Sequence, residues 1–311
     1  MKTYFVKRVL MSLPVAAGVL VLVFLLMHMV PGDPVEVMLG ESAAPADREA
    51  LRESLHLDEP LVTQFGLFMK ELFTGGLESI FYHRPVLDVI SGRLGNTVVL
   101  ALSALIVSLL VSIPLGVAAA VRRGGAVDAG AMGFSLVGVS MPTFWLGPML
   151  ILVFSIKLGW LPVSGKGGLA HLVLPSLTLG FGMAAIVSRM VRGSLLDILG
   201  REYLRVARAK GLSERVVIAK HALRNALIPT ITIVGLQAGA LLSGAIITET
   251  IFAWPGVGRL LIDAINTRDF PLVQGAVIVI ALSYVLVNLV TDLLYAVADP
   301  RVRFEGKTDA G

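Results

Sequence analysis

Residues 96–121 read NTVVLALSALIVSLLVSIPLGVAAAV and contain no charged side chain. A helix of about 20 apolar residues is long enough to cross the ~30 Å hydrocarbon core of a lipid bilayer. Hydrocarbon offers the backbone no hydrogen-bonding partner, so a chain crosses it as a helix or as a closed β-barrel. Barrel strands alternate apolar and polar residues over about ten positions, and this stretch does not. It therefore predicts a transmembrane helix, which decides the fold class.

Five other charge-free stretches accompany this one. They are Val9–Val30, Ala129–Ile156, Gly167–Ser188, Asn225–Thr248 and Phe270–Thr291. The composition agrees with so many spans, because apolar residues make up 56% of the 311 residues, charged residues only 15%, and the mean hydropathy is +0.83. Soluble globular domains carry about 25% charged residues, and disordered chains are far less apolar. We therefore predict an all-α membrane protein with six transmembrane helices, each span forming one helix.

The basic residues predict the orientation, because Lys and Arg concentrate in the cytoplasmic loops of membrane proteins. With the N-terminus inside, the inner segments hold 17 of the 26 Lys and Arg residues, whereas residues 31–95, outside, hold 11 Asp and Glu. Both termini are therefore predicted to be cytoplasmic. The first span follows Lys2, Lys7 and Arg8, as a signal peptide would. Its apolar run is longer than the usual 7–15 residues and no A-x-A-like site follows, so we expect an uncleaved anchor.

This orientation divides the chain into four segments. An anchor helix (1–30) precedes an extracytoplasmic segment (31–95), a transmembrane core (96–297) that includes a cytoplasmic loop (193–228), and a cytoplasmic tail (298–311).

The extracytoplasmic segment carries two helical patterns. Leu61, Phe65, Phe68 and Leu72 would share one face of a helix, and Asp47–Leu55 also reads as helical. Two interpretations stay open for this segment. It would form a cap lying on the membrane surface, or a docking face for an external partner.

The cytoplasmic loop combines an apolar stripe with a row of basic residues. The stripe is Leu196, Leu199, Tyr203 and Val206, and the basic row is Arg201, Arg205, Arg208 and Lys210. Gly211 then interrupts the helix, and Ser213 is a suitable N-cap for a second one that has Glu214 in its first turn. We predict a helix–glycine–helix hook. A solvated loop needs no apolar stripe, so we expect the hook to dock into another protein; the alternative is binding to anionic lipid head groups.

Motifs for catalysis and metal binding are absent or incomplete. The chain has no cysteine, which excludes disulfides, thiolate zinc sites and Cys nucleophiles. Gly306-Lys307-Thr308 resembles the end of a phosphate-binding loop, but Arg301 stands where that motif needs its first glycine. The five histidines form no H-E-x-x-H pattern. We expect a non-enzymatic chain with no cofactor, metal or nucleotide site of its own.

Small residues and prolines predict how the spans pack and bend. Gly235, Gly239 and Ser243 lie at four-residue spacing, which lets two helices approach closely. Prolines interrupt other spans, at Pro14, Pro114, Pro142, Pro148 and Pro175. Such interruptions are common in transporters without being specific to them.

Three polar residues in or beside the spans are candidates for a translocation path. They are Glu249, Asn288 and Asp292, because ionisable groups within a membrane are usually functional. Asp292 lies near the inner end of its span. It is expected there either to be solvated or to pair with Arg301 or Arg303.

The cytoplasmic loop resembles a known sequence. It reads EYLRVARAKG over residues 202–211 and HALRNALIP over residues 221–229. This is similar to the EAA loop of binding-protein-dependent ABC importer permeases, in the variant of the dipeptide, oligopeptide, glutathione and nickel branch. Matches in order cover nearly the whole chain. They include Pro31-Gly32-Asp33-Pro34, Leu57-Asp58-Glu59-Pro60, Pro142-Thr143-Phe144, Gly159-Trp160-Leu161-Pro162, Trp254-Pro255-Gly256-Val257-Gly258-Arg259 and Asp299-Pro300-Arg301.

The resemblance implies a type I ABC importer permease fold in a bacterial inner membrane. It implies a second, homologous permease, two cytoplasmic ATPases that bind ATP and Mg, and a soluble binding protein that delivers substrate from outside; no nucleic acid is expected. The ATPase-coupling residues that it implies are Glu202, Tyr203, Arg205, Ala207, Arg208, Lys210, Gly211, His221 and Arg224. Di- or oligopeptides are the expected substrates, and glutathione or nickel stays an alternative.

Two departures from the family pattern accompany these matches. Arg205 and Val206 stand where the general EAA consensus has Glu and Ala, and Gly75-Gly76-Leu77-Glu78-Ser79 is a loose version of a G-D-L-G-x-S stretch. The rival from another class is a stand-alone secondary transporter. It would need a charged residue at mid-membrane or broken-helix ion sites, and also a duplicated half. The sequence shows no buried charge and no obvious repeat.

Overall fold

The computed structural model describes residues 2–29, 34–40, 43–54 and 56–298. Within these ranges the regular elements are helices, with one isolated β-bridge between Glu78 and Pro85. The predicted all-α class is therefore confirmed. Residues 299–311 of the predicted tail lie outside the described part of the chain. They include Arg301 and Arg303, the two predicted partners of Asp292.

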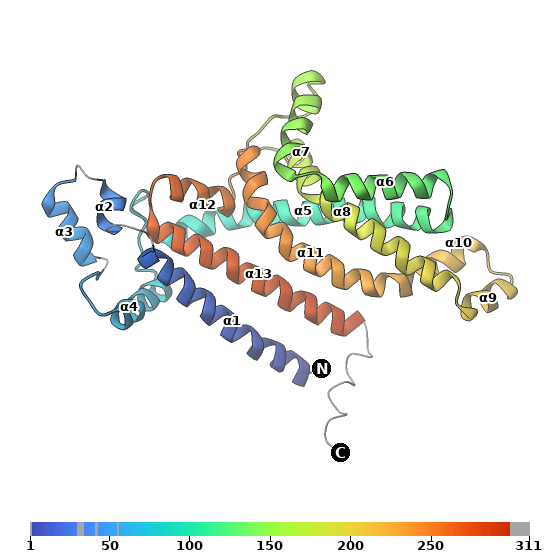
Figure 1. Ribbon diagram of the computed structural model, residues 1–311, viewed down its shortest axis with the longest axis horizontal. Coiled ribbons are helices and arrows are strands. Elements are labelled where there is room, and N and C mark those ends of the chain that lie inside the picture. Colours follow the sequence, from blue (N-terminus) through green and yellow to red (C-terminus); the bar gives the residue numbers. More distant parts are fainter. Residues whose placement is uncertain (1, 30–33, 41–42, 55, 299–311) are drawn as a thin grey trace, which may run out of the picture.

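The helices follow one another in the order labelled in Figure 1. They are α1 (Lys2–Met29), α2 (Pro34–Leu39), α3 (Pro45–Ser54), α4 (Leu61–Thr74), α5 (Val86–Val121), α6 (Ala126–Ser140), α7 (Thr143–Leu150), the π-helix η1 (Ile151–Lys157), α8 (Ala170–Leu199), α9 (Glu202–Ala209), α10 (Glu214–Val216), the π-helix η2 (Val217–Ala222), α11 (Leu223–Ile251), α12 (Val257–Asn266) and α13 (Phe270–Ala298).

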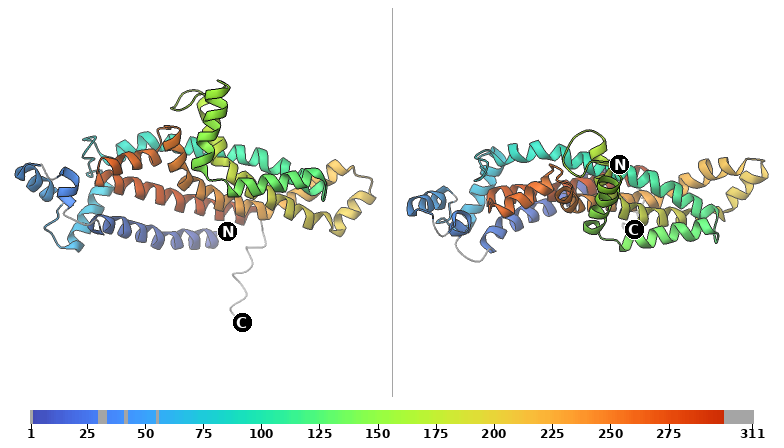
Figure 2. Two further views of the ribbon diagram at one scale, coloured as in Figure 1. Left: turned by 45° about the horizontal axis from the view of Figure 1, so that its top comes forward. Right: turned by 90° about the horizontal axis from the view of Figure 1, so that it is seen from above.

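Five spans among the described residues are long and apolar enough to cross a membrane on their own. They lie in α1, α5, α8, the run from α10 to α11, and α13, and the bent pair of α6 with α7–η1 makes a sixth when it is counted as one span. In Figures 1 and 2 the long helices form an elongated bundle. The hook helices α9 and α10 lie at one end, α2 to α4 lie at the other, and α7 stands off to one side.

The prediction of one continuous helix over Ala129–Ile156 is wrong. The chain breaks between α6 and α7, and the two halves meet at a bend of 109°. Met141 adopts an extended conformation with φ −89° and ψ 116°, because the ring of Pro142 disfavours helical geometry in the residue before it. Proline also lacks the N–H that would continue the helix.

The fourth span is longer than predicted. It runs to Leu199, eleven residues past the predicted end at Ser188, because two arginines inside it find partners on α6. Arg192 forms a bidentate ion pair with Asp128, with Nη2 2.7 Å from Oδ2. Arg189 Nε donates to Ser135 Oγ at 3.1 Å. A search for charge-free stretches therefore ends this helix too early.

Close backbone approach holds the central helices together. A side chain on Gly116 of α5 would place Cβ 2.6 Å from the carbonyl oxygen of Ser188 on α8. On α11, a Cβ on Gly235 would overlap Thr291 of α13, and one on Gly239 would meet Tyr284. The predicted packing role of these two glycines is confirmed, whereas the Ser243 side chain lies outside what the structure describes.

The segment that the sequence predicts to be extracytoplasmic packs on the C-terminal half of α1. Both predicted helices exist, as α3 and α4; Leu55, the predicted end of the first, lies outside the described residues. Phe68 and Leu72 are buried as expected, but Leu61 is 53% exposed and Gln64 is buried instead. The Gln64 amide donates to two carbonyls of the preceding turn and its oxygen lies 3.0 Å from His28 Nε2. These hydrogen bonds satisfy a polar side chain that the apolar pattern could not place.

Candidate functional site

The hook, which the sequence predicts to be cytoplasmic, consists of α9, a turn at Gly211, α10 and η2. Gly211 has φ +79°, a left-handed conformation that glycine adopts without steric cost. The predicted helix–glycine–helix pattern is present, but the predicted apolar stripe is divided. Leu196 and Leu199 belong to α8, which ends before α9 begins, so they do not continue into Tyr203 and Val206.

The inner face of the hook packs on the transmembrane core. Leu204 and Val217 are fully buried and Ala207 is 8% exposed. With Ala222 of η2, they form one apolar cluster with a buried residue from each of three long helices, namely Ala120 of α5, Leu195 of α8 and Ala226 of α11. Burial of this face fixes the hook to the inner ends of α5, α8 and α11. The sequence pattern missed Leu204, although its three-residue spacing from Ala207 is the signal that marks a shared helical face.

The outer face of the hook is both apolar and basic. Tyr203 and Val206 are 43% and 54% exposed, and Leu212 and Val216 are also exposed. Basic residues surround them, including Arg201, Arg205, Lys210, Arg215 and Arg224, all of them exposed. Nothing in the described part of the chain covers this face. An exposed apolar patch rimmed by polar groups is typical of a protein interaction surface.

Polar contacts hold the two arms of the hook together. Arg208 Nε lies 2.6 Å from Glu214 Oε1, across the Gly211 turn. Asn225 Nδ2 donates to Tyr203 Oη at 3.0 Å, and Tyr203 Oη lies 3.4 Å from the carbonyl oxygen of His221. Of the predicted coupling residues, Ala207 faces inward, His221 is half-buried, and Glu202 is exposed beside the basic residues. Sequence reasoning did not single out Asn225 as a partner of Tyr203.

The three predicted translocation-path residues lie in two separate places. Asp292 Oδ2 pairs with Arg8 Nη1 of α1 at 2.9 Å, and Asn288 lies one helical turn away, close to Gly239 of α11. Glu249 lies ten residues beyond Gly239, which corresponds to about 15 Å along the helix. A translocation role for the three residues stays a prediction.

Glu249 is completely buried near the end of α11. One carboxylate oxygen accepts a hydrogen bond from Thr97 Oγ1 of α5 at 2.6 Å, and the other accepts from the backbone N–H of Arg259 at 3.0 Å. No sequence pattern predicts this arrangement, because Thr97 and Glu249 are 152 positions apart.

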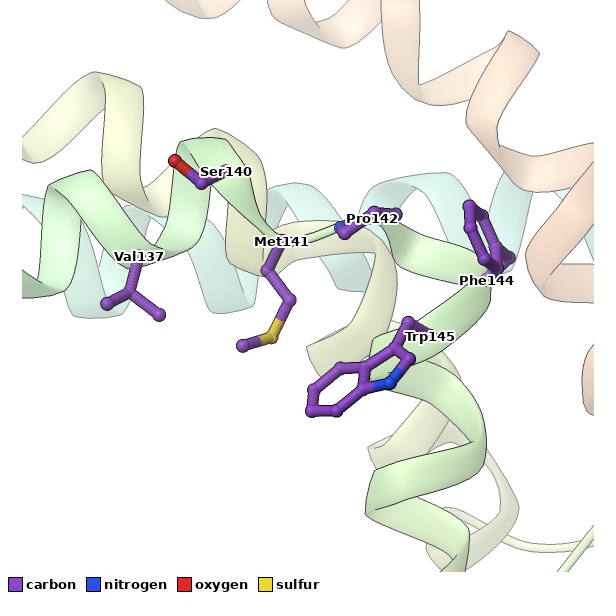
Figure 3. Close-up of a pocket in the computed structure, with 6 residues that line it drawn as sticks. All are labelled: Val137, Ser140, Met141, Pro142, Phe144 and Trp145. Atoms are coloured by element: carbon purple, nitrogen blue, oxygen red, sulfur yellow. The ribbon is translucent and has the colours of Figure 1, made fainter.

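A concave apolar surface lies at the bend between α6 and α7. Its cavity volume is about 430 Å³. The lining residues come from both sides of the bend and are Val137, Ser140, Met141, Pro142, Phe144 and Trp145. In Figure 3 the side chains of Met141 and Trp145 point to the same side of the bend. Sequence reasoning identified the proline but not the surface that it creates. No group of three or more His, Asp or Glu side chains suited to a metal ion occurs within the described residues.

Known proteins match the chain over nearly its whole length. A family model described as "Binding-protein-dependent transport system inner membrane component" matches residues 112–304, and an N-terminal companion model of such membrane components matches residues 1–101. The dipeptide transport system permease protein DppB of Alkalihalophilus pseudofirmus is 40% identical over 98% of this chain and 100% of its own length. The glutathione transport system permease protein GsiC of Escherichia coli is 43% identical over the same shares.

A solved structure shows the same fold. The chain aligns with a structure of the MetNI methionine ABC transporter in an inward-facing conformation, with a TM-score of 0.55 and 18% sequence identity. The alignment covers 69% of this chain and 98% of that one. The predicted fold of a type I ABC importer permease is confirmed. With the two family models and the two relatives, this likeness leads to one conclusion: the chain belongs to the inner-membrane components of binding-protein-dependent transport systems.

Proposed function

We propose that the chain is one permease of an ATP-driven importer for di- or oligopeptides or a related small solute. The hook carries this proposal, because its inner face is fixed to three long helices while its outer face is exposed, apolar and basic. The names of the relatives support the substrate class, since one is a dipeptide permease and another a glutathione permease. Nickel is the further alternative within the same architecture.

The proposed assembly has four other protein subunits besides this chain. A second, homologous permease would complete the translocation path across the bilayer, and two cytoplasmic ATPases would bind ATP and Mg. A soluble binding protein would deliver the solute from outside. This chain would then be a non-catalytic subunit with both termini in the cytoplasm and no cofactor of its own.

The hook suits the transfer of movement from an ATPase to the membrane. When the ATPases close on ATP, the ATPase that is bound to the outer face of the hook displaces α9 and α10. The buried cluster around Leu204 passes that displacement to α5, α8 and α11, because close-packed interiors transmit strain. The two permeases would thereby change the side on which their path is open.

Reconstitution tests this function. The chain is purified with its candidate partner subunits, placed in proteoliposomes with ATP, and offered labelled dipeptides, glutathione or nickel together with the binding protein. We expect ATP-dependent uptake that requires both the ATPases and the binding protein, and the solute that is taken up identifies the branch. Uptake by this chain alone under an ion gradient would contradict the proposal and support a secondary transporter.

A further inference from the structure

A buried network of hydrogen bonds, here called the outer node, joins α5 to the end of α11 that is farthest from the hook. Its centre is the Glu249 carboxylate, which is completely buried and accepts hydrogen bonds from Thr97 Oγ1 and from the backbone N–H of Arg259. Burying a carboxylate is costly unless its oxygens are hydrogen-bonded. Both oxygens are bonded here, so the node is a satisfied structure.

Residues of α5 hold the loop that links α11 to α12. Thr97 Oγ1 accepts a hydrogen bond from the backbone N–H of Val257 at 2.8 Å, while its own hydroxyl proton goes to Glu249. Asn96 Nδ2 donates to the Pro255 carbonyl oxygen at 2.7 Å, and the Asn96 carbonyl accepts from Trp254 Nε1 at 3.0 Å. Two consecutive residues of α5 thus contact this segment through three hydrogen bonds.

The loop leaves room for the carboxylate only because glycines stand beside it. A Cβ on Gly256 would lie 2.0 Å from Glu249 Oε1, and a Cβ on Gly258 would lie 3.0 Å from Oε2. Real side-chain atoms do not approach so closely. The backbone of this loop is therefore shaped around the Glu249 side chain.

The two helices that meet at the outer node also meet at the hook. α11 is a single helix of 29 residues, about 43 Å long, and its inner end contributes Ala226 to the cluster beneath the hook. α5 contributes Ala120 to the same cluster. α11 is therefore joined to α5 near both of its own ends, by apolar packing at the hook and by buried hydrogen bonds at the outer node.

We propose that Thr97 and Glu249 are positioning residues for transport: the outer node holds the end of α11 in one geometry against α5 at Thr97, so that a displacement of the hook moves the two helices together. The inference rests on the proposed function, because it assumes that an ATPase displaces the hook. Without the node, the inner ends would still move, but the outer loop would not follow.

A conservative pair at position 97 tests the inference in the full importer complex. Thr97→Val keeps the shape of the side chain but removes the hydroxyl that Glu249 and Val257 both use, whereas Thr97→Ser keeps that hydroxyl. We expect Thr97→Val complexes to assemble and to retain basal ATP hydrolysis, while the solute imported per ATP falls by about tenfold, the loss expected for one buried hydrogen-bonding group. Thr97→Ser should stay within about twofold of the wild type.

A second pair disturbs the carboxylate without removing any hydrogen-bonding group. Gly256→Ala would push Glu249 out of its place, whereas a Cβ on Gly95 of α5 meets nothing within 4 Å. Gly256→Ala should reproduce the loss of coupling, and Gly95→Ala should not.

The outcomes separate the two proposals. Absence of ATP-driven uptake by the wild-type complex would overturn the proposed function and this inference with it. If the wild type works and the Thr97→Val variant is fully coupled, the inference alone is overturned. Loss of uptake in Glu249→Gln without any loss in Thr97→Val would also overturn it, because Glu249 would then act through its charge on the solute. Failure of both node variants to assemble, while their controls assemble, would show a role in folding only and would equally overturn it.

Discussion

The hook and the outer node join the same two helices by different chemistry. At the hook, apolar side chains around Leu204 face inward and the charged side chains are exposed. At the outer node, a carboxylate and a hydroxyl are buried, and hydrogen bonds join them to each other and to the backbone of α12. Apolar packing has no preferred direction, whereas hydrogen bonds weaken steeply when they are bent. The difference indicates that the hook end suits a moving contact and the outer end a fixed one.

The largest expected effect comes from the turn of the hook. Gly211→Val should abolish uptake and the stimulation of ATP hydrolysis by substrate, because a β-branched residue is strained at φ +79°. Membrane insertion should be unaffected, since the turn lies outside the spans. Uptake in proteoliposomes measures the effect. Gly200→Ala is the matched control, because Gly200 has φ −83° and open space around it. Normal uptake by Gly211→Val would remove the hook from the mechanism.

The next largest effect separates the inner face of the hook from its outer face. Leu204→Ala removes a fully buried side chain and should destabilise the hook by about 2–5 kcal/mol. Val206→Ala alters a side chain that is 54% exposed and should leave the hook stable while weakening its binding to the ATPase. Hydrogen–deuterium exchange of residues 202–222 reports the first effect, and copurification of the ATPase reports the second. Equal exchange in both variants would contradict the assignment of faces.

Sequence patterns predicted the parts of the molecule that depend on local spacing. The apolar run 96–121 and the turn at Gly211 were found because length, hydropathy and a single glycine are sufficient signals. The end of α8 was misplaced because Arg192 is neutralised by Asp128, 64 positions away. Pro142 was named among the prolines that interrupt the spans, but only there does the helix break, since the other four lie inside helices.

The outer node could not be predicted from the sequence, because it depends on the packing of two distant helices. Glu249 was recognised as unusual because an acid beside a membrane span is rare. Its partner Thr97 is an ordinary residue within another span, and only the packing of α5 against α11 brings the two together. Likewise, Gly256 and Gly258 read as a family motif, but the structure shows that they make room for a carboxylate.

A second buried carboxylate tests whether the outer end as a whole is fixed. Asp269 is 1% exposed and accepts hydrogen bonds from Ser79 Oγ and from the backbone N–H groups of Phe81 and Leu272. Asp269→Ala leaves these donors unpaired, which should cost about 2–3 kcal/mol and raise the proteolytic sensitivity of residues 75–85. Asp263→Ala is the control, since Asp263 is half-exposed and lies 3.9 Å from Arg259. Unchanged proteolysis in Asp269→Ala would show that this end is held by packing alone.

The smallest effect concerns the ion pair across the hook, and it decides what Arg208 does. Both members of the pair are partly exposed, and such pairs contribute little to stability. If Arg208 serves only to bind Glu214, then Arg208→Ala and Glu214→Ala should each lower uptake by no more than about twofold, and the double variant should be no worse. If Arg208 also orients the ATPase, as the family resemblance implies, Arg208→Ala should be the more damaging change and should remain so when Glu214 is absent. A double-mutant cycle on uptake separates the two roles. We expect the second result, because the Arg208 side chain is 35% exposed on the hook and the Glu214 carboxylate holds its guanidinium in place.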